Sequence, residues 1–196
     1  MPAISEHSPL ILASGSRYRA ELLRRLGLPF EQDPPDLDES PRPGEPAKVL
    51  AGRLAAAKAQ VVAVRRPGRW VLGSDQVCAC GDRVLGKPGS RERARDQLGL
   101  LSGREARFLT AVALAGDGML HEALDLTVVR FRQLQAAEIE RYLDAEPAYD
   151  CAGSFKAEGL GVSLCAAIES SDPTGLIGLP LIAVRELLAK AGLRLP

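Results

Sequence analysis

The sequence has few aromatic residues, only two histidines and no excess of charge of either sign. Aromatic residues make up 4% of the 196 residues, so few side chains are available to stack on the bases of a single-stranded nucleic acid. Lys and Arg together number 25, as do Asp and Glu, so no broad basic surface is expected for duplex DNA or RNA. We therefore expect no nucleic-acid partner, although a local basic cluster could still bind one small polyanion.

The sequence also lacks long apolar runs and closely spaced cysteines. A membrane-spanning helix needs about 20 consecutive apolar residues, and no run in this chain reaches that length. The apolar stretch at residues 10–13 is too short for a signal peptide, and no basic segment precedes it. The cysteines form no C-x-x-C pair and suit small buried side chains in a reducing compartment better than a zinc site. They are Cys78, Cys80, Cys151 and Cys165. We expect a cytoplasmic protein that does not bind membranes.

The residues that are present fit one globular domain with a mixed sheet. The chain is long enough, with 46% hydrophobic residues, to bury a core of its own, so we expect a single domain over residues 1–196. Strands are predicted at 9–13, 70–72, 108–115 and 121–131, helices at 16–26, 47–64, 90–101, 135–143 and 180–192, and hairpin turns at 81–82 and 116–118. This mixture of βα units and hairpins predicts an α/β fold with a mixed sheet and flanking helices.

Several familiar fingerprints of nucleotide and acyl chemistry are missing. The sequence contains no G-x-x-x-x-G-K-[ST] segment, and no G-x-G-x-x-G follows a predicted strand. It also lacks a G-x-S-x-G elbow, and neither His7 nor His121 is placed for a serine triad. These absences argue against a P-loop enzyme, a dinucleotide-binding domain and a serine hydrolase.

A strand, a turn of small residues and a helix start follow one another near the N-terminus. The turn and the first helical residues carry Ser14, Ser16, Arg17 and Arg19. Hydroxyl and guanidinium groups at the positive end of a helix can bind a phosphate. An ordinary N-cap with two solvated arginines fits the same pattern, so the residues alone leave both interpretations open.

Two lysines stand in unusual contexts. Lys58 shares a helical face with Leu50, Leu54 and Val61, where a charge needs an anionic partner or a route to solvent. We expect it to reach a phosphate or a carboxylate, with a stem extended to solvent as the alternative. Lys87 lies in a stiff loop before a proline and could present its charge to a ligand, or it could be an ordinary surface residue.

Carboxylates complete the set of candidate residues. Asp75 follows a buried strand, where α/β sheets place their ligand sites, and could hold a divalent cation or accept a proton from water. Glu39 could supply a second metal-binding carboxylate, whereas Asp36 and Asp38 beside it fit a solvated acidic loop. Glu158, in a glycine-rich stretch, could accept hydrogen bonds from a base edge, or the stretch could be a mobile loop.

Together these residues are typical of a site for a polyphosphate and a metal ion. They include no convincing nucleophile for covalent catalysis, so the chemistry they favour is hydrolysis by a metal-activated water. A regulatory protein that senses a nucleotide without hydrolysing it would use the same phosphate-binding residues, and metal-dependent release of pyrophosphate would distinguish the two.

These segments resemble the Maf family of nucleoside triphosphate pyrophosphatases over nearly the whole chain. In order from Leu10 to about Leu188, the matching segments are LILASGSRYRAELL, DLDESPR, GSDQV, LGKP, LSG, DCAGSFKAEGLG and GLIGLPL. Each segment alone is weak, but all of them in this order and spacing are specific. GSDQ and FKAEG look like the branch that acts on 7-methyl-GTP, whereas the branch acting on dTTP and UTP typically has Thr after the Asp and Gln at the second place.

The resemblance implies a fold, an activity and roles for particular residues. It implies a Maf/ITPase-like α/β fold with two lobes around a central cleft, often dimeric, which leaves a homodimer open for this chain. It implies cleavage of the α–β phosphate bond of a nucleotide, on 7-methyl-GTP or alternatively on dTTP, UTP or CTP, with Mg²⁺ or Mn²⁺ as the cofactor. The implied roles are Asp75 as proton acceptor, Ser14, Ser16, Arg19, Lys58 and Lys87 as phosphate-binding residues, Glu39 and Asp75 as metal ligands, and Tyr18, Gln76 and Glu158 as determinants of substrate choice. Tyr18 stands where Trp is expected in the 7-methyl-GTP branch, and either ring can stack on a positively charged methylated guanine.

Overall fold

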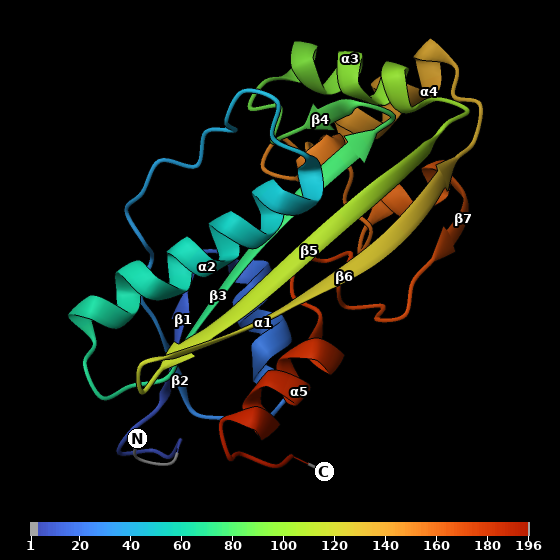
Figure 1. The fold of residues 1–196 in the computed structure, drawn as a ribbon. Coiled ribbons are helices and arrows are strands. Elements are labelled where there is room, and N and C mark those ends of the chain that lie inside the picture. Colours follow the sequence, from blue (N-terminus) through green and yellow to red (C-terminus); the bar gives the residue numbers. More distant parts are fainter. Residues whose placement is uncertain (1–3, 196) are drawn as a thin grey trace. The chain divides into compact units, whose positions relative to one another are not determined.

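Seven strands form one mixed sheet in the computed structural model, which describes residues 4–195 (Figure 1). The strand order is β2-β1-β3-β5-β6-β7, and β4 pairs with β3. Pairing is parallel between β1 and both β2 and β3, and antiparallel between β3 and β4 and between β6 and β7. The strands are β1 Leu10–Ala13, β2 Phe30–Gln32, β3 Val71–Cys80, β4 Arg83–Leu85, β5 Glu105–Gly116, β6 Met119–Phe131 and β7 Cys165–Glu169. The prediction of an α/β fold with a mixed sheet is confirmed.

The chain forms two compact units, and the boundaries between them fall inside long strands. Unit 1 comprises Met1–Asp75, Thr110–Asp125 and Asp172–Pro196, and unit 2 comprises Gln76–Leu109 and Leu126–Ser171. The strands β3, β5 and β6 each contribute residues to both units. A single domain over residues 1–196 stays a prediction.

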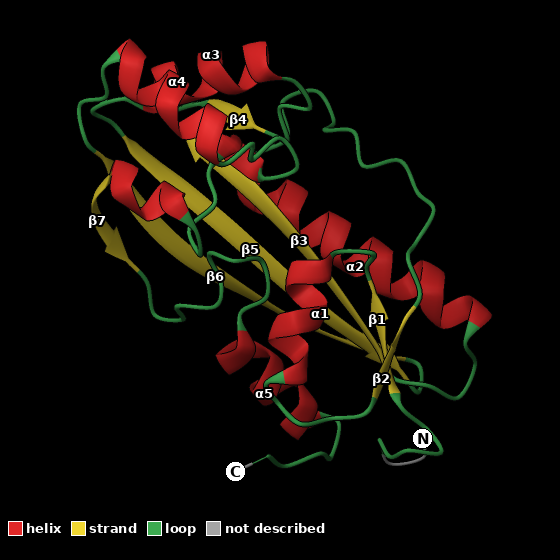
Figure 2. Cartoon of the chain, turned by 180° about the vertical axis from the view of Figure 1, so that it is seen from behind, coloured by secondary structure: helices red, strands yellow, loops and turns green. Residues whose placement is uncertain are grey.

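Both faces of the sheet are covered by helices within unit 1. The helix α2, Ala47–Arg65, lies on one face, and α1, Arg17–Arg24, and α5, Leu181–Lys190, lie on the other (Figure 2). Alternate residues of β1 point to opposite faces: Leu10 and Leu12 join the core cluster that contains residues of α1 and α5, whereas Ile11 and Ala13 pack with Val62 of α2. An unbroken apolar strand is the expected sequence for a position buried on both sides.

Serine side chains begin two of the helices, as the sequence predicts. Ser16 Oγ accepts a hydrogen bond from the backbone N–H of Arg19 at 3.4 Å, and Ser90 Oγ accepts one from Arg93 at 3.4 Å. Each satisfies one of the N–H groups that a helix start leaves without an internal partner. The first helix ends at Arg24, two residues earlier than predicted, and Gly27 beyond it adopts φ +65°.

Unit 2 has its own core and its own pair of helices. Phe155 lies with its ring centroid 5.8 Å from that of Phe108 and 5.3 Å from that of Phe131. The helices α3, Arg91–Leu101, and α4, Ala136–Ala145, are joined by Arg91, which pairs with Glu140 at 2.5 Å and with Asp144 at 2.7 Å. Short 3-10 helices at Ala152–Ser154 and Leu160–Leu164 flank the glycine-rich stretch.

The predicted end of the strand at residue 72 is wrong, because β3 continues through the polar quartet 73–76 to Cys80. Gly73 lies against α2 so closely that a Cβ there would be 2.3 Å from the backbone oxygen of Ala55 and 2.7 Å from the nitrogen of Ala59. Ser74 and Asp75 are buried in mid-strand, but both have polar partners. The polar residues 73–76 therefore belong to a continuous strand and not to a turn.

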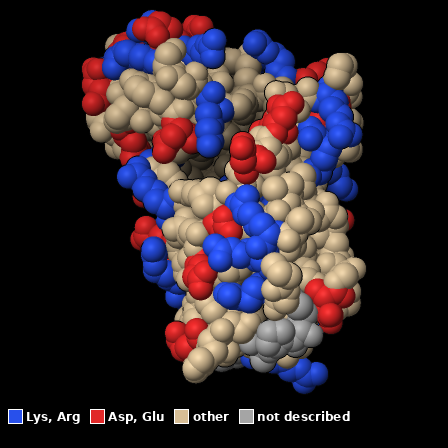
Figure 3. Space-filling view, turned by 90° about the vertical axis from the view of Figure 1, so that its left-hand side faces the viewer, with Lys and Arg blue, Asp and Glu red and all other residues tan. Residues whose placement is uncertain are grey.

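The remaining expectations from composition concern membranes and cysteines. Among residues 4–195, no helix is both long enough and apolar enough to cross a membrane. All of the cysteines are free thiols; Cys78 and Cys80 are buried, and Cys151 and Cys165 are partly exposed. On the face that Figure 3 shows, Lys and Arg side chains intermingle with Asp and Glu, in keeping with the zero net charge.

Candidate active site

Lys58 lies at the centre of an ionic cluster in unit 1. Its Nζ donates to Oδ1 of Asp75 at 2.8 Å and to Oε2 of Glu39 at 2.8 Å. Lys58 is 5% exposed and Asp75 is 7% exposed, whereas more than half of the Glu39 side chain is exposed. The sequence left two interpretations of Lys58 open. The structure agrees with the one in which the lysine binds carboxylates.

The close contact between α2 and β3 positions the Lys58–Asp75 pair. Gly73 lets the strand backbone touch the helix at Ala55 and Ala59, on either side of Lys58 in the helix. Asp75, two residues along the strand, leaves the sheet on the same face as Gly73 and so meets the lysine. The predicted helical face was partly wrong: Leu50 and Leu54 are buried with Lys58, but Val61 is 39% exposed and Val62 takes the buried position.

Glu39 reaches the cluster from a loop without regular structure, which α2 holds in place. Arg53 donates to both carboxylate oxygens of Glu45, at 2.6 Å and 2.8 Å, and to the backbone oxygen of Ser40 at 3.1 Å. Glu45 also accepts from the backbone N–H of Arg42, and these bonds lower its pKa to about 2. The forked pairing of Arg53 with Glu45 therefore ties the loop to the helix that carries Lys58.

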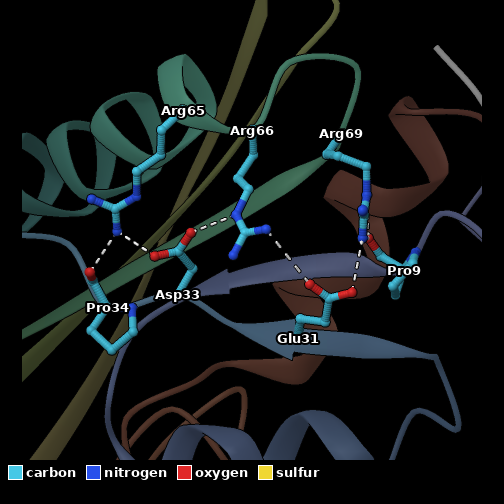
Figure 4. Close-up of polar contacts among 7 residues, drawn as sticks. All are labelled: Pro9, Glu31, Asp33, Pro34, Arg65, Arg66 and Arg69. Carbon is cyan, nitrogen blue, oxygen red and sulfur yellow. Dashed lines mark hydrogen bonds and ion pairs between the residues drawn. The ribbon is translucent and has the colours of Figure 1, made fainter.

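The other end of the same loop is fixed by arginines at the C-terminal end of α2 (Figure 4). Asp33 lies between two guanidinium groups: Arg65 bonds one carboxylate oxygen and also the backbone oxygen of Pro34, and Arg66 Nε bonds the other carboxylate oxygen at 2.6 Å. Hydrogen bonds from Arg65 and Arg66 lower the pKa of Asp33. The loop that carries Glu39 is thus held by basic residues at both ends.

The other acids of this loop lie where the sequence suggests. Asp36 and Asp38 are exposed, and Asp38 Oδ1 accepts from the backbone N–H of Ser40 at 2.9 Å. Of the acids in this loop, Glu39 therefore binds Lys58, whereas Asp36 and Asp38 remain in contact with solvent.

Arg19 is bound on two sides by groups from distant parts of unit 1. Its Nη1 donates to Oγ of Ser14 at 3.3 Å, and its Nε donates to the backbone oxygen of Gly178 at 2.9 Å. Ser14 is buried and also accepts from the backbone N–H of Ser16 at 3.2 Å. Arg19 is therefore a built-in part of the turn, whereas Arg17 is exposed.

Two contributors to this arrangement were not predicted from the sequence. Ser74 Oγ donates to the same Gly178 oxygen at 3.0 Å. Ser74 gave no signal beyond lying next to Asp75, and Gly178 acts through its backbone oxygen, which the residue type does not reveal. The motif GLIGLPL was the only sign that this segment matters.

Tyr18 lies beside a cation in the structure. The guanidinium carbon of Arg17 is 4.7 Å from the centroid of the Tyr18 ring, and Arg17 Nη2 donates to the tyrosine hydroxyl at 2.7 Å. An aromatic ring attracts cations to its face through its quadrupole. In the structure the Tyr18 ring therefore has a protein cation as its partner, and its role in substrate choice stays a prediction.

The other predicted residues belong to unit 2. Gln76 follows Asp75 directly in β3, so the two side chains leave the strand on opposite faces. Lys87 is exposed in the loop between β4 and α3, and Glu158 is exposed between the two 3-10 helices.

The stretch around Glu158 is braced by side chains from α4 and its end. Glu146 Oε2 accepts from the backbone N–H of Gly161 at 3.3 Å, and Glu146 Oε1 pairs with Lys156 Nζ at 3.1 Å. Tyr142 Oη accepts from the backbone N–H of Lys156 at 3.2 Å. A Cβ at Gly159 would lie 2.2 Å from Glu146 Oε1, so this carboxylate fits only against a glycine.

The carboxylates of unit 1 suit a metal ion only in part. Within the described residues, no three His, Cys, Asp or Glu side chains gather into a group that could hold a metal by themselves. Magnesium, however, is commonly held by one or two protein carboxylates together with the phosphates of its substrate. Glu39 and Asp75 each give one oxygen to Lys58, and among residues 4–195 the second oxygen of each makes no hydrogen bond or ion pair. The donor set therefore fits a divalent cation that arrives with a polyphosphate.

Electrostatics favour both proton transfer and anion binding here. Burial raises the pKa of Asp75, while the charges of Lys58 and Arg19 lower it. Burial also lowers the pKa of Arg19, against the attraction of Asp75 and Glu39, and an arginine remains protonated even so. Unit 1 thus combines a carboxylate of increased basicity with two fixed cations, a set suited to hydrolysis of a phosphoanhydride.

Comparison with known proteins places this arrangement in a family. A family model described as "Maf-like protein" matches residues 9–191. The chain is 60% identical over 187 residues to a protein of Xanthomonas oryzae pv. oryzae (strain MAFF 311018) named 7-methyl-GTP pyrophosphatase, an alignment that covers 95% of this chain and 98% of that protein. It is 54% identical over 194 residues to a protein of the same name from Bordetella pertussis, covering 98% and 96% of the two chains. The prediction made from the sequence motifs is confirmed: the chain belongs to the Maf family.

Proposed function

We propose that this protein hydrolyses the α–β phosphate bond of 7-methyl-GTP and releases 7-methyl-GMP and pyrophosphate. The observation that carries the proposal is the buried pair of Lys58 and Asp75, joined by Glu39 and with Arg19 nearby, in a member of the Maf family. The relatives named 7-methyl-GTP pyrophosphatase, aligned over almost their whole length, support the choice of substrate.

The cations of the site bind the phosphates. Arg19 offers a planar guanidinium whose direction is set by Ser14 and Gly178, and Lys58 offers a buried ammonium. Positive groups fixed before the reaction stabilise the charge that develops on the leaving pyrophosphate at little reorganisation cost. Ser14 and Ser16 hold the turn, and Lys87 adds a cation from unit 2.

Asp75 accepts the proton of the attacking water. The water oxygen forms a bond to phosphorus as the α–β anhydride bond breaks, and the electron pair of that bond leaves with an oxygen of the anhydride. Burial raises the pKa of Asp75 and makes it a better base than an exposed aspartate. Lys58 donates to Oδ1 and so fixes the direction of the carboxylate.

A divalent cation, Mg²⁺ or Mn²⁺, is part of the proposal. Glu39 and Asp75 would hold it together with the phosphates, and when bound it would neutralise phosphate charge and lower the pKa of water. The chain's own contribution is to keep the two carboxylates near each other, through Lys58 and the loop clamps at Asp33 and Glu45.

Base selection is assigned to Tyr18, Gln76 and Glu158. A 7-methylated guanine is positively charged, so an aromatic ring can stack on it by cation–π attraction and a carboxylate can pair with it. The contact of Tyr18 with Arg17 supports the view that this ring accepts a cation. Gln76 and Glu158 supply hydrogen-bonding groups for the guanine edge.

The proposal extends to the surroundings in which the enzyme works. Its partner is a free nucleotide rather than a nucleic acid or a membrane, and its place is the cytoplasm. The balanced charge and the few aromatic residues support the expectation that it binds no nucleic acid. A homodimer is the expected assembly if the chain is not a monomer.

The test is a direct assay of the purified protein. It is incubated with 7-methyl-GTP, GTP, CTP, UTP and dTTP, each with Mg²⁺ or Mn²⁺, and the monophosphate and pyrophosphate are quantified. We expect conversion of 7-methyl-GTP far ahead of the others and none in the presence of a chelator. Preference for UTP or dTTP would overturn the assigned substrate, and binding without turnover would indicate a nucleotide sensor instead.

A further inference from the structure

The segment that precedes α5, residues 172–180, enters the proposed mechanism only through the contact of Gly178 with Arg19. The backbone oxygen of Gly178 accepts from Arg19 Nε at 2.9 Å and from Ser74 Oγ at 3.0 Å. A carbonyl oxygen has two lone pairs, and these two donors use both. Gly178 is buried and adopts φ +123°, a conformation that residues with a Cβ rarely adopt.

This contact determines where the guanidinium of Arg19 points. A guanidinium is planar, so hydrogen bonds from Nε to Gly178 and from Nη1 to Ser14 fix the plane and its rotation. The remaining N–H directions are fixed with it. Bidentate recognition of a phosphate depends on such alignment, so the Gly178 oxygen determines how well Arg19 can bind one.

A buried anion at the first residue of the segment ties the segment to the start of α5. Asp172 is 3% exposed. Its Oδ1 accepts from Thr174 Oγ1 at 2.6 Å and from Thr174 N at 2.9 Å, and its Oδ2 accepts from Ile182 N at 2.7 Å. Thr174 Oγ1 accepts in addition from Leu181 N at 2.8 Å. The carboxylate thus satisfies N–H groups at the positive end of the helix and closes the segment on itself.

A second attachment fixes the middle of the segment to the sheet. Thr110 Oγ1, on β5, donates to the backbone oxygen of Gly175 at 2.9 Å. A Cβ at Gly175 would lie 2.3 Å from Asp125 Oδ2, so the backbone lies directly against β6 as well. The segment is therefore attached at α5, at the sheet and at Arg19.

We infer that residues 172–180 form a positioning segment for the phosphate-binding arginine, with Asp172 as its anchor and the Gly178 oxygen as its point of contact. Asp172 and Thr174 are positioning residues that act through Arg19. The inference rests on the proposed function, because it assigns Arg19 to a phosphate of the nucleotide.

The experiment is a double-mutant cycle between Asp172 and Arg19. The dissociation constant is measured for the non-hydrolysable α,β-methylene analogue of 7-methyl-GTP, with Asp172→Asn, Arg19→Ala and the double variant, and KM and kcat are measured in parallel for 7-methyl-GTP. We expect Asp172→Asn to weaken binding about 5- to 10-fold in the wild-type background, which corresponds to about 1–1.4 kcal/mol. In the Arg19→Ala background it should change binding less than about twofold, because the group that it positions is gone.

Two substitutions of Thr174 test whether the effect on binding is purely structural. Thr174→Ser keeps the hydroxyl and should retain wild-type affinity, whereas Thr174→Val removes it and should behave like Asp172→Asn, including in the Arg19→Ala background. This pair also replaces Asp172→Asn if that variant does not fold. The exposed Glu186 of α5 provides a control, since Glu186→Gln should leave affinity and stability unchanged.

The outcomes separate this inference from the proposed function. Equal effects of Asp172→Asn with and without Arg19, or no effect at all, would overturn the positioning role whatever the turnover. A wild-type protein that binds the analogue but hydrolyses no triphosphate would refute the enzyme activity, while the binding cycle would still support or reject the positioning segment.

Discussion

The Nζ atom of Lys58 lies 2.8 Å from Oδ1 of Asp75, and the backbone contact of their two elements at Gly73 brings them together. Both side chains are buried, with 6% and 10% of their surfaces exposed. A buried ion pair is costly to break from one side only, because the remaining charge is left without a partner. The pair is therefore both a part of the proposed chemistry and a constraint on the fold.

Substitution of one or both partners should reveal this coupling. Lys58→Met should lower the free energy of unfolding by about 3 kcal/mol, measured by urea denaturation without nucleotide. The double variant Lys58→Met/Asp75→Asn should regain most of that loss, because it leaves no unpaired buried charge and more than half of the remaining Glu39 side chain is exposed to water. If the two variants are equally unstable, the ion pair contributes no coupling energy.

Asp75→Asn alone should nearly abolish hydrolysis and leave nucleotide binding largely intact. An amide cannot accept the proton of water, and a general base contributes about 10²- to 10⁴-fold to a rate. Single-turnover assays with 7-methyl-GTP would measure the first effect and calorimetry the second. Asp82→Asn, in the exposed turn between β3 and β4, should have no effect. Near-normal turnover by Asp75→Asn would rule out its assignment as the base.

The base preference should change when the residues assigned to it are exchanged. Gln76→Thr together with Glu158→Gln removes the carboxylate proposed to pair with the methylated base. We expect the ratio of kcat/KM for 7-methyl-GTP to that for UTP or dTTP to fall at least about 10-fold, the equivalent of 1.4 kcal/mol. An unchanged ranking of substrates would reject the roles of both residues.

Stability should depend on pH through the clamp at Asp33. The hydrogen bonds of Arg65 and Arg66 lower the pKa of Asp33 in the folded protein, so the clamp is fully effective above the unfolded value of about 4 and is lost as the pH falls through the folded value. At neutral pH, Asp33→Asn should be less stable than the wild type by on the order of 1 kcal/mol, and the difference should shrink below about pH 4.

Thermal unfolding from neutral to acid pH would test this, with the exposed Asp36→Asn as the matched control from the same loop. A stability difference that stays constant through acid pH would show that the ionised form of Asp33 is not what matters.

The sequence predicts best those features in which a residue acts on its own neighbours. The caps at Ser16 and Ser90 and the hairpin turn at residues 81–82 each depend on a few adjacent residues, and they are present in the structure. The burial of Lys58 could also be inferred, because a lysine in an apolar stripe needs a partner. Its partners could not, since they come from a loop and a strand 19 and 17 residues away.

The sequence analysis did not predict features that depend on backbone groups far away in the chain. The strand β3 continues through residues 73–76 because α2 and the segment before α5 supply partners for Ser74 and Asp75, which no local pattern reveals. Gly178 acts through a carbonyl oxygen that every residue type possesses, 159 positions from Arg19 in the chain. Only its conformation distinguishes it, and that is a property of the folded chain.

The peptide bond between Asp75 and Gln76 is also where the first segment of unit 1 meets the first segment of unit 2. Most of the proposed hydrolytic residues lie before this point, whereas Gln76 and Glu158, two of the three residues assigned to the base, lie in unit 2. Substitutions at Gln76 and Glu158 can therefore change the preferred base while the ion cluster of unit 1 keeps its own contacts.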